Sequence, residues 1–160
     1  INDISGGDID EKMFETVAQL NVPYILMHMR GTPKNMASMT DYTNVTVEVI
    51  KSLAEKVNRL ALLGVNDVIV DPGFGFSKTI EQNYELLKNL EIFHELDRPL
   101  LVGISRKSMI YKPLSSTPQE VLNGTTVLNT IALLAGASIL RVHDVKETKD
   151  MLLVYRGLYE

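Results

Sequence analysis

The stretch VDPGFGFSKT, residues 70–79, places an acid where an apolar run ends. The run closes with Asp71, and two glycines and two phenylalanines follow within five residues. A carboxylate at the tip of a buried strand can accept paired hydrogen bonds from the N–H edge of a flat ring, and this pairing is strongest where water is excluded. Because aspartate is also a common turn residue, Asp71 could instead serve only its own turn.

Two further motifs have the composition of an anion site. SRKS, residues 105–108, offers two cations and two hydroxyls at an expected strand–helix junction, where free N–H groups and the helix dipole favour an anion. In RVHD, residues 141–144, Arg141 and His143 alternate along an expected strand and therefore face the same side. Arginine binds phosphate or pyrophosphate in a bidentate manner. The three motifs together indicate a flat, cationic or amidine-edged ring that bears a phosphate.

The hydrophobic pattern alternates between a helical period and short apolar runs. Thr79 and Gln82 have the spacing of a capping box, and STPQE, residues 116–120, is a second helix-start signal. Helices are expected over residues 9–20, 43–63, 80–90, 117–136 and 144–158. Strands are expected over residues 1–3, 23–29, 67–71, 99–105 and 138–144.

This order amounts to about five strand–helix units of an α/β protein. The strands are short and apolar on both faces, as parallel strands covered by helices are. An open doubly wound sheet would want a glycine fingerprint in its first turn, and SGGDID is not G-x-G-x-x-G. A (β/α)8 TIM barrel has eight units in about 250 residues. We therefore expect residues 1–160 to form a single barrel domain that is incomplete at its N-terminus, as a start at Ile1 rather than methionine also indicates.

Polar residues gather at the ends of the expected strands. Because parallel strands bring their carboxyl ends to one edge, these residues predict a site at that edge. Taken singly the candidate residues have simpler explanations: His28 could be a satisfied inner-barrel histidine, Arg106 a surface residue or an ion-pair partner, and Phe74, in the loop after Asp71, a core residue. The strand-end residues are Asn2, Asp3, His28, Arg30, Asp71, residues 105–108 and residues 141–144.

The composition limits the kinds of partner and of chemistry that the protein can have. A net charge of −4 gives no basic footprint for nucleic acid. No apolar run approaches the roughly 20 residues that span a bilayer, so no membrane partner is expected. The chain has no cysteine, which excludes disulfides and cysteine-based metal or nucleophile chemistry. These features are compatible with a reducing compartment, and we expect a cytoplasmic protein.

Five motifs resemble, in order and spacing, the strand-end motifs of the dihydropteroate synthase family. The resemblance covers the chain from end to end, and DPGFGF, SRKS and RVHDV are nearly diagnostic. It implies a TIM-barrel transferase of folate biosynthesis, and a sulfonamide target. Such an enzyme joins 6-hydroxymethyl-7,8-dihydropterin pyrophosphate to 4-aminobenzoate and releases pyrophosphate. The motifs are INDISGG, ILMHMRGTPKNM, VIVDPGFGFSKT, LVGISRKSMI and ILRVHDVKET.

The resemblance also implies roles for individual residues. Lys107 and Ser108 would contact 4-aminobenzoate, and Arg141 and His143 would hold the pyrophosphate. Lys107, Arg141 and His143 would act in catalysis. The pterin would be bound by Asn2, Met27, Asp71, Phe76, Gly103, Lys107 and Arg141.

The family uses Mg²⁺ and usually forms homodimers. The resemblance places the Mg²⁺ ligand before Ile1, so no metal ligand is expected in these residues, and we expect this segment alone to be inactive. Three alternatives remain open: another pterin-binding barrel such as a methyltetrahydrofolate methyltransferase, a non-catalytic partial barrel, and a generic phosphate-binding α/β enzyme. Pyrophosphate release that depends on 4-aminobenzoate would distinguish them.

Overall fold

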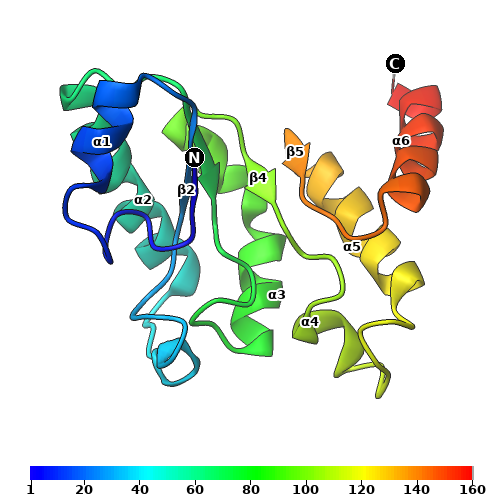
Figure 1. Ribbon diagram of the computed structural model, residues 1–160. Helices are drawn as coiled ribbons and strands as arrows, with labels where there is room; N and C mark the ends of the chain where they lie inside the picture. Colours follow the sequence, from blue (N-terminus) through cyan, green and yellow to red (C-terminus); the bar gives the residue numbers. More distant parts are fainter. Residues whose placement is uncertain (160) are drawn as a thin grey trace.

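The computed structural model describes residues 1–159, in which strands and helices alternate along the chain (Figure 1). The described strands are β1 (Asn2–Asp3), β2 (Tyr24–Met27), β3 (Val68–Asp71), β4 (Leu101–Val102) and β5 (Ile139–Leu140). The helices are α1 (Met13–Leu20), α2 (Val45–Leu62), α3 (Ile80–Lys88), α4 (Ser108–Tyr111), α5 (Leu122–Leu134) and α6 (Val145–Tyr159). Two 3₁₀ helices, η1 (Met36–Ser38) and η2 (Leu90–Leu96), complete the order.

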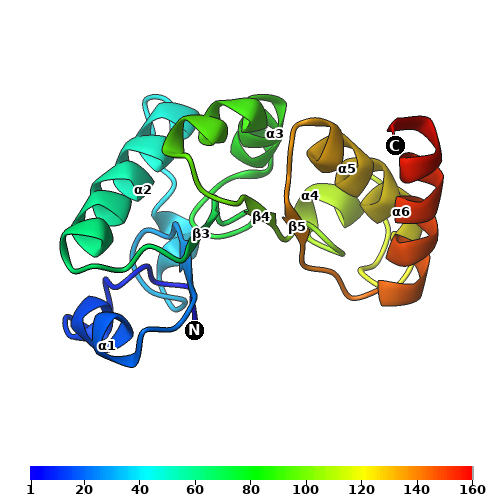
Figure 2. The same cartoon turned by 90° about the horizontal axis from the view of Figure 1, so that it is seen from above.

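Each strand lies beside the next strand in sequence, and every pairing is parallel. β1 pairs with β2, β2 with β3, and β4 with β5, while one bridge between Val70 and Leu100 joins β3 to β4. A doubly wound sheet would reverse its strand order at a switch point, and the described strands show no reversal. Figure 2 shows the helices following one another in an arc outside the strands. The prediction of a (β/α)8 barrel with about five units in this chain is confirmed as a partial barrel.

Helix α2 shows how the apolar pattern builds the core between strands and helices. The Asn44 side chain accepts a hydrogen bond from the Val47 N–H at 2.9 Å and fixes the start of the helix. The predicted apolar stripe is fully confirmed, because Val45, Val49, Leu53, Val57 and Leu60 are all buried. Each such side chain contributes about 1.5–3 kcal/mol by leaving water.

One predicted helix start is confirmed and two differ. The capping box at Thr79 and Gln82 is confirmed, with both side-chain hydrogen bonds present. The similar signal at Thr117 does not start a helix, because its hydroxyl donates to the Glu120 carboxylate at 2.9 Å and closes a local turn instead. Helix α5 begins at Leu122, after the buried Val121. Helix α1 likewise begins at Met13, and turns occupy residues 4–7 and 11–12 of the segment before it.

The last two strands are shorter, and the last helix is less buried, than the sequence predicted. β4 and β5 have two residues each, whereas the sequence predicted strands over 99–105 and 138–144. On α6, Val154 and Leu158 are 71% and 76% exposed, although the sequence predicted an inward apolar face that includes Leu158. The chain therefore leaves part of this apolar face uncovered. No helix among residues 1–159 combines the length and hydropathy needed to cross a bilayer.

Candidate functional site

Asp71 is the last residue of β3, and its side chain is only 1% exposed. Its Oδ1 accepts a hydrogen bond from the Gly73 N–H at 2.8 Å, which closes the turn after the strand. Its Oδ2 accepts from Nη2 of Arg141 at 2.7 Å. The carboxylate therefore serves its own turn with one oxygen, as one interpretation required, and pairs with Arg141 through the other; its binding of a ring stays a prediction.

The loop that follows, residues 72–77, is held close to the end of β2. Gly73 has φ +72°, and a Cβ built there would lie 2.0 Å from the carbonyl oxygen of His28. Only glycine can occupy this position, because backbone rather than a flexible side chain stands in the way. Phe74 is fully buried and is a core residue, whereas Phe76 is half-buried beside Lys107.

Lys107 approaches the loop from the β4–α4 connection. Its Nζ donates to the carbonyl of Phe74 and lies 4.8 Å from the centre of the Phe76 ring. Burial lowers the pKa of Lys107 to about 8, while the negative charge of Asp71 opposes that shift and Arg141 adds to it. The structure thus brings Lys107, Phe76 and Asp71 together, as predicted.

Arg141 follows β5 and reaches across to the first strand. Its Nη1 donates to Oδ1 of Asn2 at 3.3 Å, and its Nη2 donates to Asp71. A Cβ on Gly103 would lie 2.8 Å from Nη2, so the absence of a side chain at 103 leaves room for the guanidinium. Residues beside four different strands therefore meet at one guanidinium group, in agreement with the predicted clustering of strand ends.

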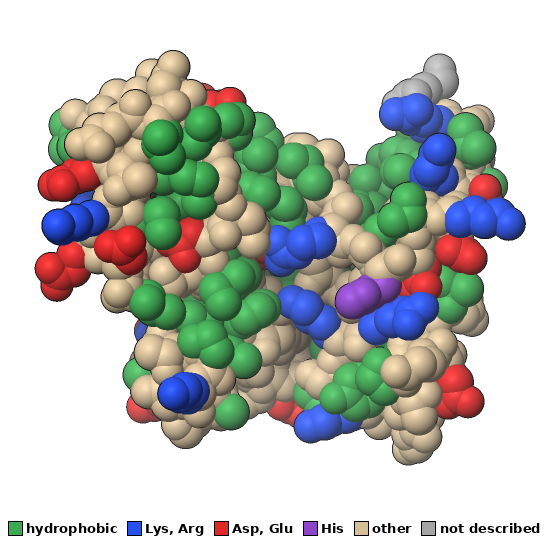
Figure 3. Space-filling view, viewed as in Figure 1, with side chains coloured by type: hydrophobic (Ala, Val, Ile, Leu, Met, Phe, Trp, Pro, Cys, Tyr) green, Lys and Arg blue, Asp and Glu red, His purple; other side chains and the backbone are tan. Residues whose placement is uncertain are grey.

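The other predicted ligands lie around this centre. Met27 ends β2, is fully buried, and is paired in register with Asp71. Ser108 is the first residue of α4, which has only four residues and therefore a much weaker dipole than the expected helix. His143 is exposed, and its backbone N–H donates to the Ser105 hydroxyl at 3.2 Å. In Figure 3, Lys and Arg side chains and one histidine lie near the middle of the face shown.

Arg106, the other cation of SRKS, does not face the centre. Its guanidinium forms a bidentate pair with Asp144, in which Nε lies 3.0 Å from Oδ2. The hydrogen bond from Arg106 lowers the pKa of Asp144. The idea that both cations of SRKS bind an anion is wrong for Arg106 in this arrangement, and the alternative that it is an ion-pair partner is confirmed.

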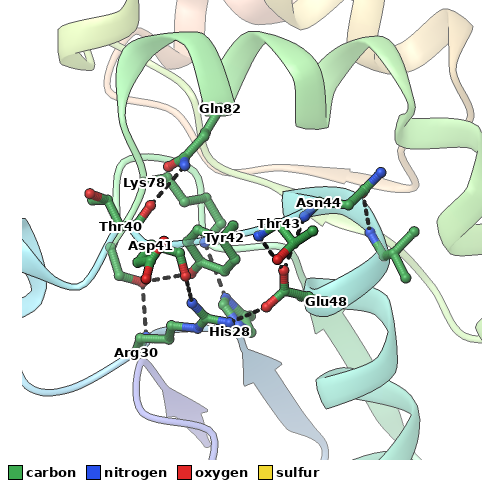
Figure 4. A network of polar contacts seen from close by, with 12 residues as sticks. His28, Arg30, Thr40, Asp41, Tyr42, Thr43, Asn44, Glu48, Lys78 and Gln82 are labelled. Atoms are coloured by element: carbon green, nitrogen blue, oxygen red, sulfur yellow. Dashed lines mark hydrogen bonds and ion pairs between the residues drawn. The ribbon is translucent and has the colours of Figure 1, made fainter.

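A second polar network lies beside the loop, at the start of α2 (Figure 4). Arg30 pairs with Glu48 at 2.5 Å, and its guanidinium lies 3.7 Å from the centre of the Tyr42 ring. The backbone N–H of Arg30 also donates to the Ser77 hydroxyl at 2.8 Å. Arg30 was expected at the site edge as a strand-end residue; its charge instead anchors residues 31–43 against α2.

Lys78 was not among the predicted site residues. This lysine is only 8% exposed, and its ammonium lies 3.1 Å from Nδ1 of His28 (Figure 4). Its position in the sequence could have predicted its burial, because Lys78 lies between the aromatic loop 72–77 and the capping box at Thr79, and both neighbours pack against the core. His28 is buried and bonded, as the simpler of its two interpretations required.

The strand-end carboxylates Asp3 and Asp71 are engaged by neighbouring residues of the chain. Within residues 1–159, no three His, Cys, Asp or Glu side chains gather in an arrangement suited to a metal. The carboxylates nearest the centre are already engaged: Asp71 by Arg141 and Gly73, and Asp3 by Ser5, Gly7 and Tyr24.

Known proteins share both the sequence and the structure. The chain is 44% identical to dihydropteroate synthase of Escherichia coli strain K12, over 88% of this chain and 50% of that protein. It is 39% identical to dihydropteroate synthase of Haemophilus influenzae, over 98% of this chain and 58% of that protein. The chain thus spans about half the length of these curated relatives.

The crystal structure of dihydropteroate synthase from Thermus thermophilus superposes with a TM-score of 0.94 at 35% identity. The superposition covers 99% of this chain and 64% of that one. The same Thermus enzyme is known in complex with 6HMPPP and with 4-aminobenzoate. Residues 1–143 match the family described as pterin binding enzyme. This chain therefore belongs to the family of pterin-binding enzymes.

Proposed function

We propose that this chain carries the pterin-binding part of a dihydropteroate synthase. The reaction would join 6-hydroxymethyl-7,8-dihydropterin pyrophosphate to 4-aminobenzoate, giving 7,8-dihydropteroate and pyrophosphate. The observation that carries the proposal is the meeting of Asn2 of β1, Asp71 at the end of β3 and Arg141 after β5, with Lys107 beside them. The relatives named dihydropteroate synthase, and the related complexes with 6HMPPP and 4-aminobenzoate, support the same reaction.

The pterin edge would take the place that the Arg141 guanidinium now holds. Asp71 and Asn2 present oxygen acceptors to the N–H fork of Arg141, and a pterin offers a similar row of N–H donors along its pyrimidine edge. Met27 and Phe76 would line the slot. Arg141, once displaced, would lie against the ring and bind the pyrophosphate together with His143.

The bond changes are those of a substitution at carbon. The C–O bond between the pterin methylene and pyrophosphate breaks, and its electron pair leaves with the pyrophosphate oxygen. The amine nitrogen of 4-aminobenzoate attacks the methylene carbon, forms the C–N bond and then loses a proton. The protein would contribute positive charge at the leaving group, from Arg141 and His143, and alignment of the two substrates.

Lys107 and Ser108 would hold the second substrate. The Lys107 ammonium lies between the Phe76 ring and the Asp71 side of the slot, where it would bond the pterin carbonyl and border the aminobenzoate. Ser108 would contact the carboxylate of 4-aminobenzoate. A sulfonamide would compete for that position; dihydropteroate synthase of Yersinia pestis has been crystallised with a sulfonamide drug.

The decisive assay is pyrophosphate release by the full-length protein. We expect release only when both the pterin pyrophosphate and 4-aminobenzoate are present, with 7,8-dihydropteroate as the organic product. A methyltetrahydrofolate methyltransferase would instead transfer a methyl group and release no pyrophosphate. A protein that binds pterin but forms no dihydropteroate would be the non-catalytic alternative. Either result would refute the proposal.

Three further properties belong to the proposal: a requirement for Mg²⁺, a cytoplasmic location and a homodimeric assembly. The homodimer is proposed from the family resemblance. The uncovered apolar face of α5 and α6, which pack against each other at one end of this partial barrel (Figure 2), is a surface that a second copy or the rest of the barrel would cover. On this face Leu134, Val154 and Leu158 are 52%, 71% and 76% exposed. An exposed apolar surface of this kind is typical of an interface.

A further inference from the structure

Lys78 has three acceptors around its buried ammonium. Its Nζ lies 3.1 Å from Nδ1 of His28 and 3.0 Å from each of the carbonyl oxygens of Gly73 and Phe76. An ammonium has three N–H donors, so the number of acceptors equals the number of donors. An uncharged side chain of similar shape would leave all three buried acceptors without this donor, which is costly inside a protein.

These three acceptors belong to the two segments that form the wall of the pterin slot. His28 directly follows Met27 at the end of β2, while Gly73 and Phe76 lie near the two ends of loop 72–77. The same loop closes the turn of Asp71 and carries the Phe76 ring. One ammonium therefore ties the loop to the neighbouring strand at both of its ends.

The charges around Lys78 come from several elements. Burial lowers the pKa of Lys78 to about 7, and Lys107 and Arg30 lower it further, while the carboxylate of Asp71 opposes the shift. Burial also holds the pKa of His28 well below its usual range, with the positive charges of Lys78, Lys56 and Arg30 contributing. His28 is therefore neutral, and its Nδ1 can accept a hydrogen bond from the ammonium if the ring proton is on Nε2.

We propose that Lys78 is a positioning residue for the pterin slot, holding loop 72–77 in the shape that presents Asp71 and Phe76 to the ring. The proposal rests on the proposed function, because it concerns the same slot. Lys78 does not touch the substrate in this arrangement; it acts through the two loop carbonyls and His28. Its loss should therefore weaken pterin binding and spare the binding of 4-aminobenzoate.

The first test is independent of any ligand. Amide hydrogen exchange of loop 72–77 is compared in the full-length protein and in Lys78→Met, which keeps the length of the side chain and removes its donors. We expect exchange in the loop to become at least tenfold faster in Lys78→Met. Lys88→Met, at an exposed position on α3, is the matched control and should leave the loop unchanged. Unchanged loop exchange in Lys78→Met would overturn the proposal.

The second test is kinetic. In Lys78→Met the KM for the pterin pyrophosphate should rise at least tenfold, while the KM for 4-aminobenzoate changes less than twofold. Lys78→Arg keeps a charge and should recover part of the loss. An equal rise in both KM values would indicate a general loss of structure and overturn the specific role. If the wild-type protein shows no activity, the proposed function fails, and the exchange experiment still decides the role of Lys78.

A third measurement uses only the wild-type protein, and it tests the proposal even if Lys78→Met does not fold. Burial lowers the pKa of Lys78 to about 7, so above that pH the closed loop binds fewer protons than an open loop in which the lysine has its ordinary pKa. Opening then takes up a proton, and loop protection, after correction for intrinsic exchange, should rise between pH 7 and 9. The peptide of α2 serves as the internal reference. Loop protection that stays constant across this pH range, relative to α2, would overturn the proposal.

Discussion

Replacing Asp71 by asparagine tests the chemistry of the slot with little change of shape. The amide oxygen can keep the 2.8 Å bond from the Gly73 N–H, so the turn should survive. The amide nitrogen then occupies the place of Oδ2, where it faces the Nη2 donor of Arg141 in the empty protein and an N–H of the ring in the complex. In both cases a donor meets a donor.

The cost differs between the two states. In the empty protein the Arg141 side chain is 40% exposed, so it can turn to water, and the loss of its ion pair is heavily screened. In the proposed pterin complex the ring would be enclosed, and each lost hydrogen bond to a charged group would cost about 1.5–3 kcal/mol. A loss of about 3 kcal/mol corresponds to roughly a hundredfold weaker binding. We therefore expect pterin affinity to fall by about two orders of magnitude while the melting temperature changes little.

The assay is calorimetric titration of a pterin into the full-length protein and its variants. Asp67→Asn is the matched control, because Asp67 is exposed just before the same strand, at its opposite end. Asp71→Glu should also bind poorly, since one added methylene displaces a contact in an enclosed slot. Wild-type affinity in Asp71→Asn would show that this carboxylate serves only its turn.

Four further outcomes are expected. Arg141→Ala should weaken the pyrophosphate-bearing pterin more than the pterin alone, by about 1.5–3 kcal/mol; equal losses in calorimetry would contradict the assignment. Gly73→Ala should lower both pterin affinity and the melting temperature, because φ is +72° and the new Cβ would clash with a backbone carbonyl; a variant that melts like wild type would refute this. Chelation of Mg²⁺ should abolish pyrophosphate release, and added Mg²⁺ should restore it; full activity in chelator removes the metal from the proposal. Leu158→Glu should shift the protein to monomer in light scattering, whereas a wild-type protein that is itself monomeric would exclude the dimer.

The fold could be predicted because its signals are redundant. The apolar stripe of α2 and the capping box at Thr79 each specify a structure locally, and burial agrees with them. The signal at Thr117 failed because a capping box is worth only about 1 kcal/mol and is satisfied equally well by a turn. The start of α5 depends instead on the burial of Val121, which is a tertiary effect.

The sequence predicted which strand ends form the site, but it did not predict which side chains pair with one another there. Arg106 and Lys107 are adjacent cations, and the sequence does not say which one faces inward. The backbone conformation determines which cation faces inward. Arg106 has φ +58°, and its side chain pairs with Asp144, whereas the side chain of Lys107 reaches loop 72–77. Lys78 was missed for a related reason, because a buried lysine depends on acceptors that come from distant segments.

The position of Arg141 makes substrate binding an exchange of partners. The slot is not empty of charge before the ligand arrives, since a guanidinium already satisfies Asp71 and Asn2. Under the proposed function, an incoming pterin must displace Arg141 from Asp71 and Asn2. The free energy lost with these contacts is recovered only if the ligand brings a new anion for the displaced arginine. The pyrophosphate is such an anion, so the chain would discriminate between the activated and the unactivated pterin before any chemistry occurs. Once pyrophosphate has left, the arginine is again without an anionic partner and would compete with the product for Asp71, which favours release.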